Sequence, residues 1–351
     1  GWHVRAREAA PAPYGRLSPT QRSVGAILVT RGEAPLTQSV LRAIENQSVA
    51  PHSLTIIDVA GRHVTPFPAD RVPDGAELVR VGRARNLGDA IRRAHAQGAR
   101  FASEQWWWIL HEDSAPEPEC LDELIQAAAV GRTVGAVGVK QMSWDGSRLL
   151  ELGIFATASA RRLERIGDDD IDQGQHDGTS DVLGVGTAGL FISAEAYEAV
   201  GGFDPALGPF GDGLELSRAA RLAGYRVIVE PTAVIRHRRA SYQGLRRPAS
   251  VSHSSDAPPR TDAEAIEVAL PEPDPERSFR ARRSAQLTNW AAFSTRPIGL
   301  LLTWFVILGL MRFVWRLASK APALARDELG AALAVAGRGR RIKAARRRLA
   351  Q

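Results

Sequence analysis

Several sequence features that indicate other classes of protein are scarce or absent in this chain of 351 residues. It contains one cysteine, Cys120, so no intrachain disulfide is available, which fits a reducing compartment. Residues 1–21 have no apolar core of the kind found in secretory signal peptides. The expected first strand–helix turn at residues 30–33 (TRGE) lacks G-x-G-x-x-G, which disfavours a dinucleotide-binding Rossmann domain.

Acidic residues are absent from the end of the chain. No Asp or Glu follows Glu328, and the basic residues of this tail are Arg338, Arg340, Arg341, Lys343, Arg346, Arg347 and Arg348. The formal net charge is +6, so the rest of the chain is close to neutral. A basic tail suits nucleic acid or an anionic membrane surface. The tail has no interleaved aromatic residues and matches no nucleic-acid-binding motif, so we expect no nucleic-acid partner.

Short apolar runs alternate with amphipathic segments along the first half of the chain. This alternation predicts an α/β fold with a mostly parallel sheet covered by helices on both faces. The predicted strands are 24–30, 54–59, 76–81, 106–110, 134–140, 149–156, 185–192 and 227–230. The predicted helices are 36–47, 86–97, 117–130, 194–200, 215–223 and 279–290. Asn86 is expected to cap the second of these helices and Gly98 to end it.

The stretch around which the chain is organised is Trp106–Leu110 with the polar residues that follow it. Five apolar residues predict a strand buried on both faces. His111, Glu112 and Asp113 then fall past the carboxyl end of that strand, where open α/β sheets bind ligands. An imidazole and carboxylates at this position suit a divalent cation that keeps open positions for phosphate oxygens. The alternative is a solvated acidic turn.

The composition predicts four parts. A lead-in covers residues 1–22, the α/β domain 23–240, a linker rich in Ser, Pro, Asp and Glu 241–278, and a membrane-associated helical region 279–351. Within the last part, residues 298–311 are uncharged and strongly apolar. Fourteen helical residues span roughly 21 Å, less than the roughly 30 Å of a bilayer core, and adding residues 313–315 supplies the missing length. A membrane span, an interfacial helix and a buried core helix all fit this segment.

Six segments, in order over about 200 residues, resemble the family 2 glycosyltransferases with the GT-A fold, in particular the large membrane-linked actinobacterial members. The segments are VGAILVTRGEAPLTQSVLRAIENQS (24–48), LTIIDVA (54–60), NLGDAIRRA (86–94), WWWILHEDSAPEP (106–118), IDQGQHDGTSDVLGVGTAGLFISAEAYEAVGGFDPAL (171–207), and FGDGLELSRAARLAGYRV (210–227) followed by TAVIRH (232–237). The resemblance covers residues 22–240 well and the later part weakly.

The resemblance implies an inverting hexosyl- or deoxyhexosyltransferase that depends on Mn²⁺ or Mg²⁺. Its donor would be a nucleotide-diphosphate sugar, and its acceptor a cell-envelope glycan or a polyprenyl-linked glycan. It would act at the cell membrane with its catalytic domain in the cytoplasm. The alternative is a non-catalytic GT-A-like scaffold of an envelope-biosynthesis complex. That alternative is favoured by two departures from the family pattern, His111 in place of the first Asp of D-x-D and Gly213 in place of a second acid.

The resemblance also assigns the metal ligands and the catalytic carboxylate. Asp113 matches the last Asp of D-x-D, and His111 and His237 would complete the metal site. Asp212 is the candidate general base for the acceptor hydroxyl, and Glu215 is the alternative. Asp212 also fits as a helix cap, and His237 as a surface residue at a strand end.

The donor is expected to bind at the carboxyl ends of the first strands. Thr30 and Arg31 would lie near the nucleotide, and Asp58 would accept a hydrogen bond from its base. Glu112 would contact the ribose, beside Asp113. Asn86 belongs to the N-x-G helix of the family's donor side. A turn or capping role for Asp58 is the other option.

Overall fold

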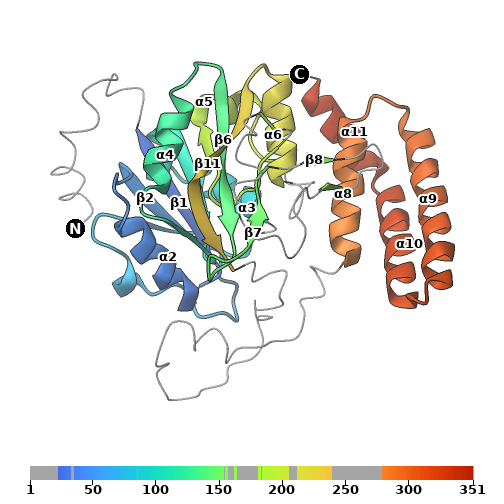
Figure 1. Cartoon of the computed structure of the whole chain (residues 1–351), viewed down its shortest axis with the longest axis horizontal. Helices are drawn as coiled ribbons and strands as arrows, with labels where there is room; N and C mark the ends of the chain where they lie inside the picture. The colour runs from blue at the N-terminus through green and yellow to red at the C-terminus, as the bar shows by residue number, and fades with distance from the viewer. Residues whose placement is uncertain are drawn as a thin grey trace, which may run out of the picture.

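The computed structural model of the chain describes residues 23–32, 35–84, 86–153, 155–156, 162–163, 181–182, 184–204, 212–238 and 279–350. The predicted lead-in, 1–22, and the predicted linker, 241–278, lie outside these residues. The described chain forms an α/β unit, residues 23–238, and a helical unit, residues 279–350 (Figure 1).

A large mixed sheet forms the centre of the α/β unit. Its strands are β1 (Val24–Thr30), β2 (Ser53–Asp58), β3 (Glu77–Arg80), β4 (Trp106–His111), β5 (Ser114–Pro116), β6 (Val134–Met142), β7 (Leu149–Glu151), β10 (Phe191–Ser193) and β11 (Arg226–His237). The order is β3-β2-β1-β4-β10-β6-β11-β5, with β7 beside β6. Two short strands, β8 (Phe155–Ala156) and β9 (Arg162–Leu163), pair with each other separately.

The strand directions explain where a site can form. Strands β3, β2, β1 and β4 are mutually parallel, as the sequence predicts, and β6 runs parallel to β11. Strand β10 lies between β4 and β6 and is antiparallel to both, so the sheet is mixed. Because β10 is antiparallel to each neighbour, β4 and β6 run in the same direction. The carboxyl ends of β1, β4, β6 and β11 therefore meet at one edge of the sheet.

The prediction of a strand at 185–192 is wrong over most of that range. Only Phe191–Ser193 pairs as a strand, and the residues before it form a loop along that edge. Gly189 has a φ of +81°, a left-handed conformation that does not continue a strand. A β-carbon on Gly189 would come within 2.7 Å of the Val139 side chain. The apolar composition reflects the burial of this loop against the sheet.

Helices cover both faces of the sheet. They are α2 (Pro35–Glu45), α3 (Leu87–Ala96), α4 (Cys120–Ala128), α5 (Ala194–Ala199) and α6 (Asp212–Leu222). Helices α2 and α4 contribute to the hydrophobic cluster on one face, and α3, α5 and α6 to the cluster on the other. Trp108 packs in the first cluster and Trp107 in the second, and both are fully buried. The uninterrupted apolar run of β4 is thus explained by burial on both sides.

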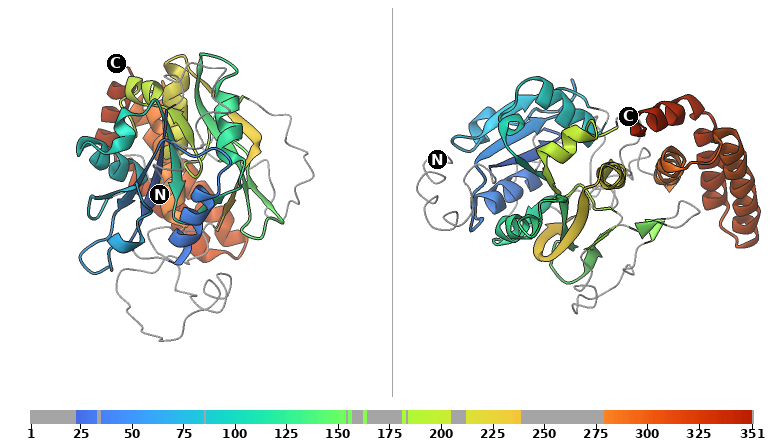
Figure 2. Two further views of the ribbon diagram at one scale, coloured as in Figure 1. Left: turned by 90° about the vertical axis from the view of Figure 1, so that its left-hand side faces the viewer. Right: turned by 90° about the horizontal axis from the view of Figure 1, so that it is seen from above.

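The helical unit contains α8 (Phe279–Phe293), α9 (Ile298–Ala318), α10 (Pro322–Ala336) and α11 (Gly339–Leu349). Figures 1 and 2 show α8 and α11 between the α/β unit and the paired helices α9 and α10. Leu301, Phe305 and Gly309 form the buried side of α9. A β-carbon on Gly309 would meet that of Ala332 at 2.6 Å, so this glycine allows close approach of α10.

A buried acidic residue joins three helices of this unit. Glu328 of α10 lies 3.5 Å from Arg283 of α8, and 3.6 and 3.7 Å from Arg312 and Arg316 of α9. Glu328 and Arg283 are both about 5% exposed. Burying either charge without the other costs several kcal/mol, so the ion pair ties the packing of α8 to that of α10.

Replacing Glu328 with glutamine is therefore expected to lower the free energy of unfolding of the helical unit by about 3 kcal/mol, because Arg283 would be left as a buried charge. Chemical unfolding followed by loss of helical circular dichroism measures this. Asp327→Asn removes the same charge from the partly exposed neighbouring position and is the control. Equal stability of the two variants would contradict the assigned role of Glu328.

Side chains also connect the two units. The Arg218 guanidinium of α6 lies 4.1 Å from the centre of the Phe293 ring and 3.4 Å from Asn289 Oδ1, both on α8. Burial lowers the pKa of Arg218 to about 10, which leaves it charged at neutral pH. Arg348 of α11 donates to the backbone carbonyls of Gly201 and Gly202. The helical unit is thus anchored on α6 and on the turn after α5.

Candidate functional site

A tight turn carries the chain from β4 to β5 and fixes the first two candidate ligands. The Ser114 hydroxyl lies 2.8 Å from the His111 amide and 3.0 Å from the His111 carbonyl, which closes the turn. Strand β5 then pairs antiparallel with β11, with Ser114 opposite His237. The backbone of Arg238 donates to the Asp113 carbonyl at 2.9 Å. This pairing brings the end of β11 to the end of β4, although the two strands are not adjacent in the sheet.

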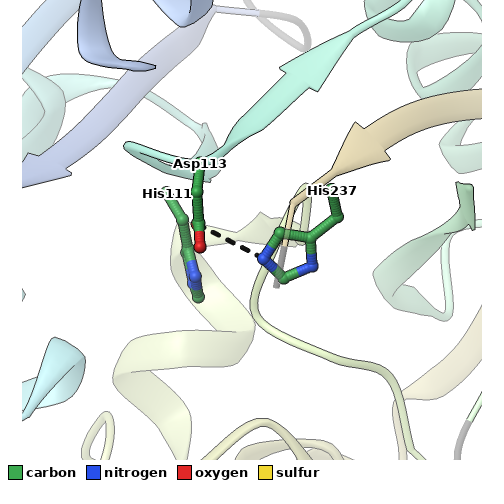
Figure 3. Close-up of side chains that lie close together, drawn as sticks. All are labelled: His111, Asp113 and His237. Atoms are coloured by element: carbon green, nitrogen blue, oxygen red, sulfur yellow. Dashed lines mark ion pairs between the residues drawn. The ribbon is translucent and has the colours of Figure 1, made fainter. Parts of the chain in front are cut away.

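His111, Asp113 and His237 converge at this edge (Figure 3). One candidate ligand atom from each lies within 4.8 Å of the others. His237 Nε2 is 3.3 Å from Asp113 Oδ1, and the two imidazole rings are nearly perpendicular with centres 5.9 Å apart. Asp113 is 1% exposed, whereas both histidines are partly exposed. A buried carboxylate between two accessible imidazoles fits a divalent cation that keeps positions open for a further ligand.

Three polar residues beside these ligands were not identified from the sequence. Gln141 of β6 contacts His237, Glu151 of β7 contacts Gln141, and Thr187 Oγ1 lies 3.0 Å from His111 Nε2. The sequence contains one signal, because Lys140 and Gln141 lie near the end of the apolar run 134–142, and the structure buries both to about 4% exposure. Polar residues in a fully buried strand call for a partner. The sequence does not show which neighbouring strand supplies it.

The carboxyl ends of β1 and β4 are tied together by Glu112. Its Oε2 accepts a hydrogen bond from the Arg31 amide at 2.8 Å and lies 3.1 Å from Thr30 Oγ1. Glu112 is 6% exposed, and Thr30 is fully buried. The structure thus brings these three predicted donor-side residues beside the Asp113 turn. These hydrogen bonds stabilise the turn between β4 and β5, and contact with a donor stays a prediction.

Asp58 and Asn86 lie at neighbouring element ends and have local partners. Asp58 accepts hydrogen bonds from the amides of Ala60 and Phe67 and from Arg80 Nη1 at 2.6 Å. These contacts organise the loop after β2, so Asp58 has the turn role that was the alternative to nucleotide binding. Asn86 caps α3 as predicted, because its side chain accepts from the Asp89 amide at 2.9 Å. Their roles toward a nucleotide stay predictions.

The start of α6 packs against the loop that borders the metal-ligand cluster. A β-carbon on Gly213 would lie 2.5 Å from the Val185 carbonyl oxygen and 3.2 Å from the Thr187 amide. A side chain does not fit at this position without a shift of the neighbouring backbone, so this packing is compatible with glycine and not with a second acid. The same packing places the backbone of Asp212, the first residue of α6, next to the segment that contains Thr187. The Asp212 side chain lies outside the described part of the structure.

Glu215, the alternative base, is 4% exposed and lies inside the fold. Its Oε2 accepts a hydrogen bond from the Asp204 amide at 3.2 Å. Asp204 in turn lies 3.8 Å from Arg348 of α11. Glu215 therefore holds Asp204 in the turn that follows α5, and its role toward an acceptor stays a prediction.

The chain is similar to known proteins in its sequence. The sequence model of the family described as "Glycosyltransferase like family 2" matches residues 21–249. Two Mycobacterium tuberculosis proteins, from strains CDC 1551 and H37Rv, are each 24% identical in an alignment of 250 residues that covers 64% of this chain and 78% of theirs. Both are described as N-acetylglucosaminyl-diphospho-decaprenol L-rhamnosyltransferase.

Two solved structures are also similar. The mannosyltransferase PcManGT of Pyrobaculum calidifontis, in complex with GDP-Man and Mn²⁺, has a TM-score of 0.44 and 20% identity, covering 95% of this chain and 93% of its own. The crystal structure of GalNAc-T7 with UDP, GalNAc and Mn²⁺ has a TM-score of 0.45 and 13% identity over 63% of this chain. This chain spans 44% of that one.

Proposed function

The chain belongs to the family 2 glycosyltransferases, and from this membership we propose that it transfers a sugar, with inversion, from a nucleotide-diphosphate donor to a lipid-linked cell-envelope glycan. The M. tuberculosis relatives, named as rhamnosyltransferases of a diphospho-decaprenol acceptor, support a polyprenyl-linked acceptor and a deoxyhexosyl donor. The family match covers the whole α/β unit, so the proposal concerns the site at the carboxyl edge of its sheet.

The observation that carries the proposal is the convergence of His111, Asp113 and His237. These residues would hold a divalent cation, which when bound neutralises the charge of the departing nucleotide diphosphate as a Lewis acid. Imidazole ligands are less suited to Mg²⁺ than carboxylates are. We therefore propose that Mn²⁺ supports the reaction better than Mg²⁺, and that His111 in place of an aspartate changes the metal preference without abolishing the site.

The roles that we propose for the other site residues follow from where these residues lie in the fold. The nucleotide would lie along the ends of β1 and β2. Thr30 and Asp58 are the last residues of these two strands, and Arg31 follows Thr30. Glu112 holds the end of β1 beside the turn that carries Asp113, where it would contact the ribose. Asp212, at the start of α6, would take the proton from the attacking acceptor hydroxyl as general base.

We further propose that the helical unit holds the enzyme at the cytoplasmic face of the membrane. Helix α9 is long enough and apolar enough to cross a membrane by length and composition. Its exposed residues include Leu300, Trp304, Met311, Val314 and Trp315 and no charged residue. Arg312 and Arg316 turn toward Glu328 on the packed side. An apolar face with tryptophans and basic flanks is suited to insertion into an anionic bilayer.

Placing two charges on this face is expected to abolish membrane binding. Trp304→Glu combined with Met311→Glu removes two exposed apolar groups, each contributing about 2 kcal/mol when buried in lipid, and should reduce partitioning by about 10³-fold. Flotation with vesicles containing phosphatidylglycerol measures it. Leu222→Glu, on an exposed apolar residue of the α/β unit, is the matched control. Unchanged flotation of the double variant would contradict membrane docking through α9.

The experiment that tests the function is nucleotide release from a panel of UDP-, GDP- and dTDP-sugars, with a polyprenyl-diphosphate-linked acceptor present. Each donor is tested with Mn²⁺, with Mg²⁺ and with chelator. We expect release from one donor that requires metal and is faster with Mn²⁺. Absence of both release and calorimetric binding for every donor would refute the enzyme and support the scaffold alternative.

A further inference from the structure

A chain of polar contacts runs from His237 across three strands, away from the metal-ligand cluster. His237 Nδ1 lies 3.0 Å from Gln141 Oε1, and Gln141 Nε2 donates to Glu151 Oε1 at 3.1 Å. The three residues lie on β11, β6 and β7, which are neighbours in the sheet. Gln141 and Glu151 are 4% and 7% exposed, so little water competes for these contacts. Nothing in the family resemblance predicts this chain of contacts.

The chemistry of the last residue fixes the direction of every hydrogen bond in it. Glu151 Oε1 accepts from both the Gly186 amide and Gln141 Nε2, so the Gln141 NH₂ group faces Glu151. The Gln141 carbonyl oxygen must then face His237, and an amide oxygen also only accepts. His237 Nδ1 must therefore carry a hydrogen. In the neutral ring this leaves the lone pair on Nε2, the nitrogen 3.3 Å from Asp113 Oδ1.

The backbone holds Glu151 in place at the far end. The Gly186 amide donates to the same Glu151 Oε1 at 3.0 Å. A β-carbon on Gly186 would collide with Glu151 Oε1 and come within 2.9 Å of Gln141 Nε2. Glycine at 186 thus lets the loop before β10 approach closely enough to bond the carboxylate. This same loop carries Thr187, which contacts His111.

We propose that Gln141 and Glu151 are positioning residues that hold His237 with a hydrogen on Nδ1, so that the Nε2 lone pair, beside Asp113, is available to a cation. This inference rests on the metal centre of the proposed function. A histidine ligand usually donates its other N–H to an oriented acceptor, and loss of that acceptor typically lowers metal affinity by about 10–100-fold. Here the acceptor is a neutral amide oriented by a carboxylate on the next strand.

Nitrogen-15 NMR of labelled histidine in the metal-free protein tests the orientation, with the His237 signals assigned from a His237→Gln variant. We expect a hydrogen on Nδ1 in wild type. Gln141→Leu should lose this preference and bind Mn²⁺ about 10–100-fold more weakly by titration calorimetry. Glu151→Gln, which conserves volume, should give a mixture of ring states and an intermediate loss. Gln126→Leu, on the exposed face of α4, is the matched control.

A neutral His237 with a bare Nδ1 in wild type would overturn the proposal, as would Mn²⁺ affinity in Gln141→Leu equal to that of the control. The NMR result does not depend on any transfer activity. A wild-type protein with hydrogen on Nδ1 that binds no Mn²⁺ would refute the metal centre while leaving the orientation intact. Failure of the proposed His237 orientation and failure of the metal centre therefore give different results.

Discussion

Replacing Asp113 with asparagine is expected to lower metal-dependent donor turnover by at least about 10²-fold, because removing even an outer-shell partner of a metal ligand costs 10–100-fold. Asp113 supplies the negative charge of the cluster and lies between the two imidazoles. Asparagine preserves the volume of this buried side chain, so the fold should be retained. Nucleotide release with saturating donor and Mn²⁺ measures the effect.

Asp70→Asn, on an exposed residue of the short 3₁₀ helix Ala69–Arg71, is the matched control for Asp113→Asn. It should leave turnover and the melting temperature unchanged. A control that loses activity equally would point to a general loss of structure. Turnover by Asp113→Asn within twofold of wild type, with the same requirement for metal, would show that the cation binds elsewhere.

Asp212→Asn is expected to reduce kcat by about 10²–10⁴-fold while leaving donor affinity unchanged, because a general base acts on the acceptor hydroxyl and not on the nucleotide. Steady-state transfer to a polyprenyl-linked acceptor, with donor affinity from calorimetry, separates the two effects. Asparagine retains the ability to cap a helix, so the start of α6 should persist.

Glu215→Gln is the informative comparison for Asp212→Asn. Glu215 accepts from the Asp204 amide and is buried, so its loss should act mainly on stability. We expect a lower melting temperature with kcat reduced far less than in Asp212→Asn. The reverse pattern, an inactive but stable Glu215→Gln with an active Asp212→Asn, would assign the base to Glu215.

The fold could be predicted where apolar residues are continuous. Trp106–Leu110 could only be a strand covered on both faces, and Trp107 and Trp108 do pack on opposite sides. The prediction was wrong at 185–192, where glycine permits a buried loop that has the same composition as a strand. The strand predicted at 227–230 was also too short, because residues 231–232 interrupt the apolar run of the sequence. The strand continues to His237 past an irregularity between Glu230 and Val234.

The candidate site could be predicted only where a local pattern marks it. His111 and Asp113 follow an apolar strand directly, and the resemblance pointed to His237. Gln141 and Glu151 could not be placed, because their contacts depend on the register of β6 with β7 and β11. The contacts of Glu328 with three arginines likewise depend on how α8, α9 and α10 pack. Hydrophobic patterns specify which face of an element is buried, but not which polar side chains meet across elements.

The measurement that tests the account most directly is a crystal structure of the protein with Mn²⁺ and the nucleotide diphosphate of its donor, with anomalous scattering recorded at the manganese edge. We predict one strong anomalous peak bonded to Asp113 and His237, with His111 and the diphosphate oxygens completing its coordination. A fully bound nucleotide with no anomalous peak among these three residues would contradict the account.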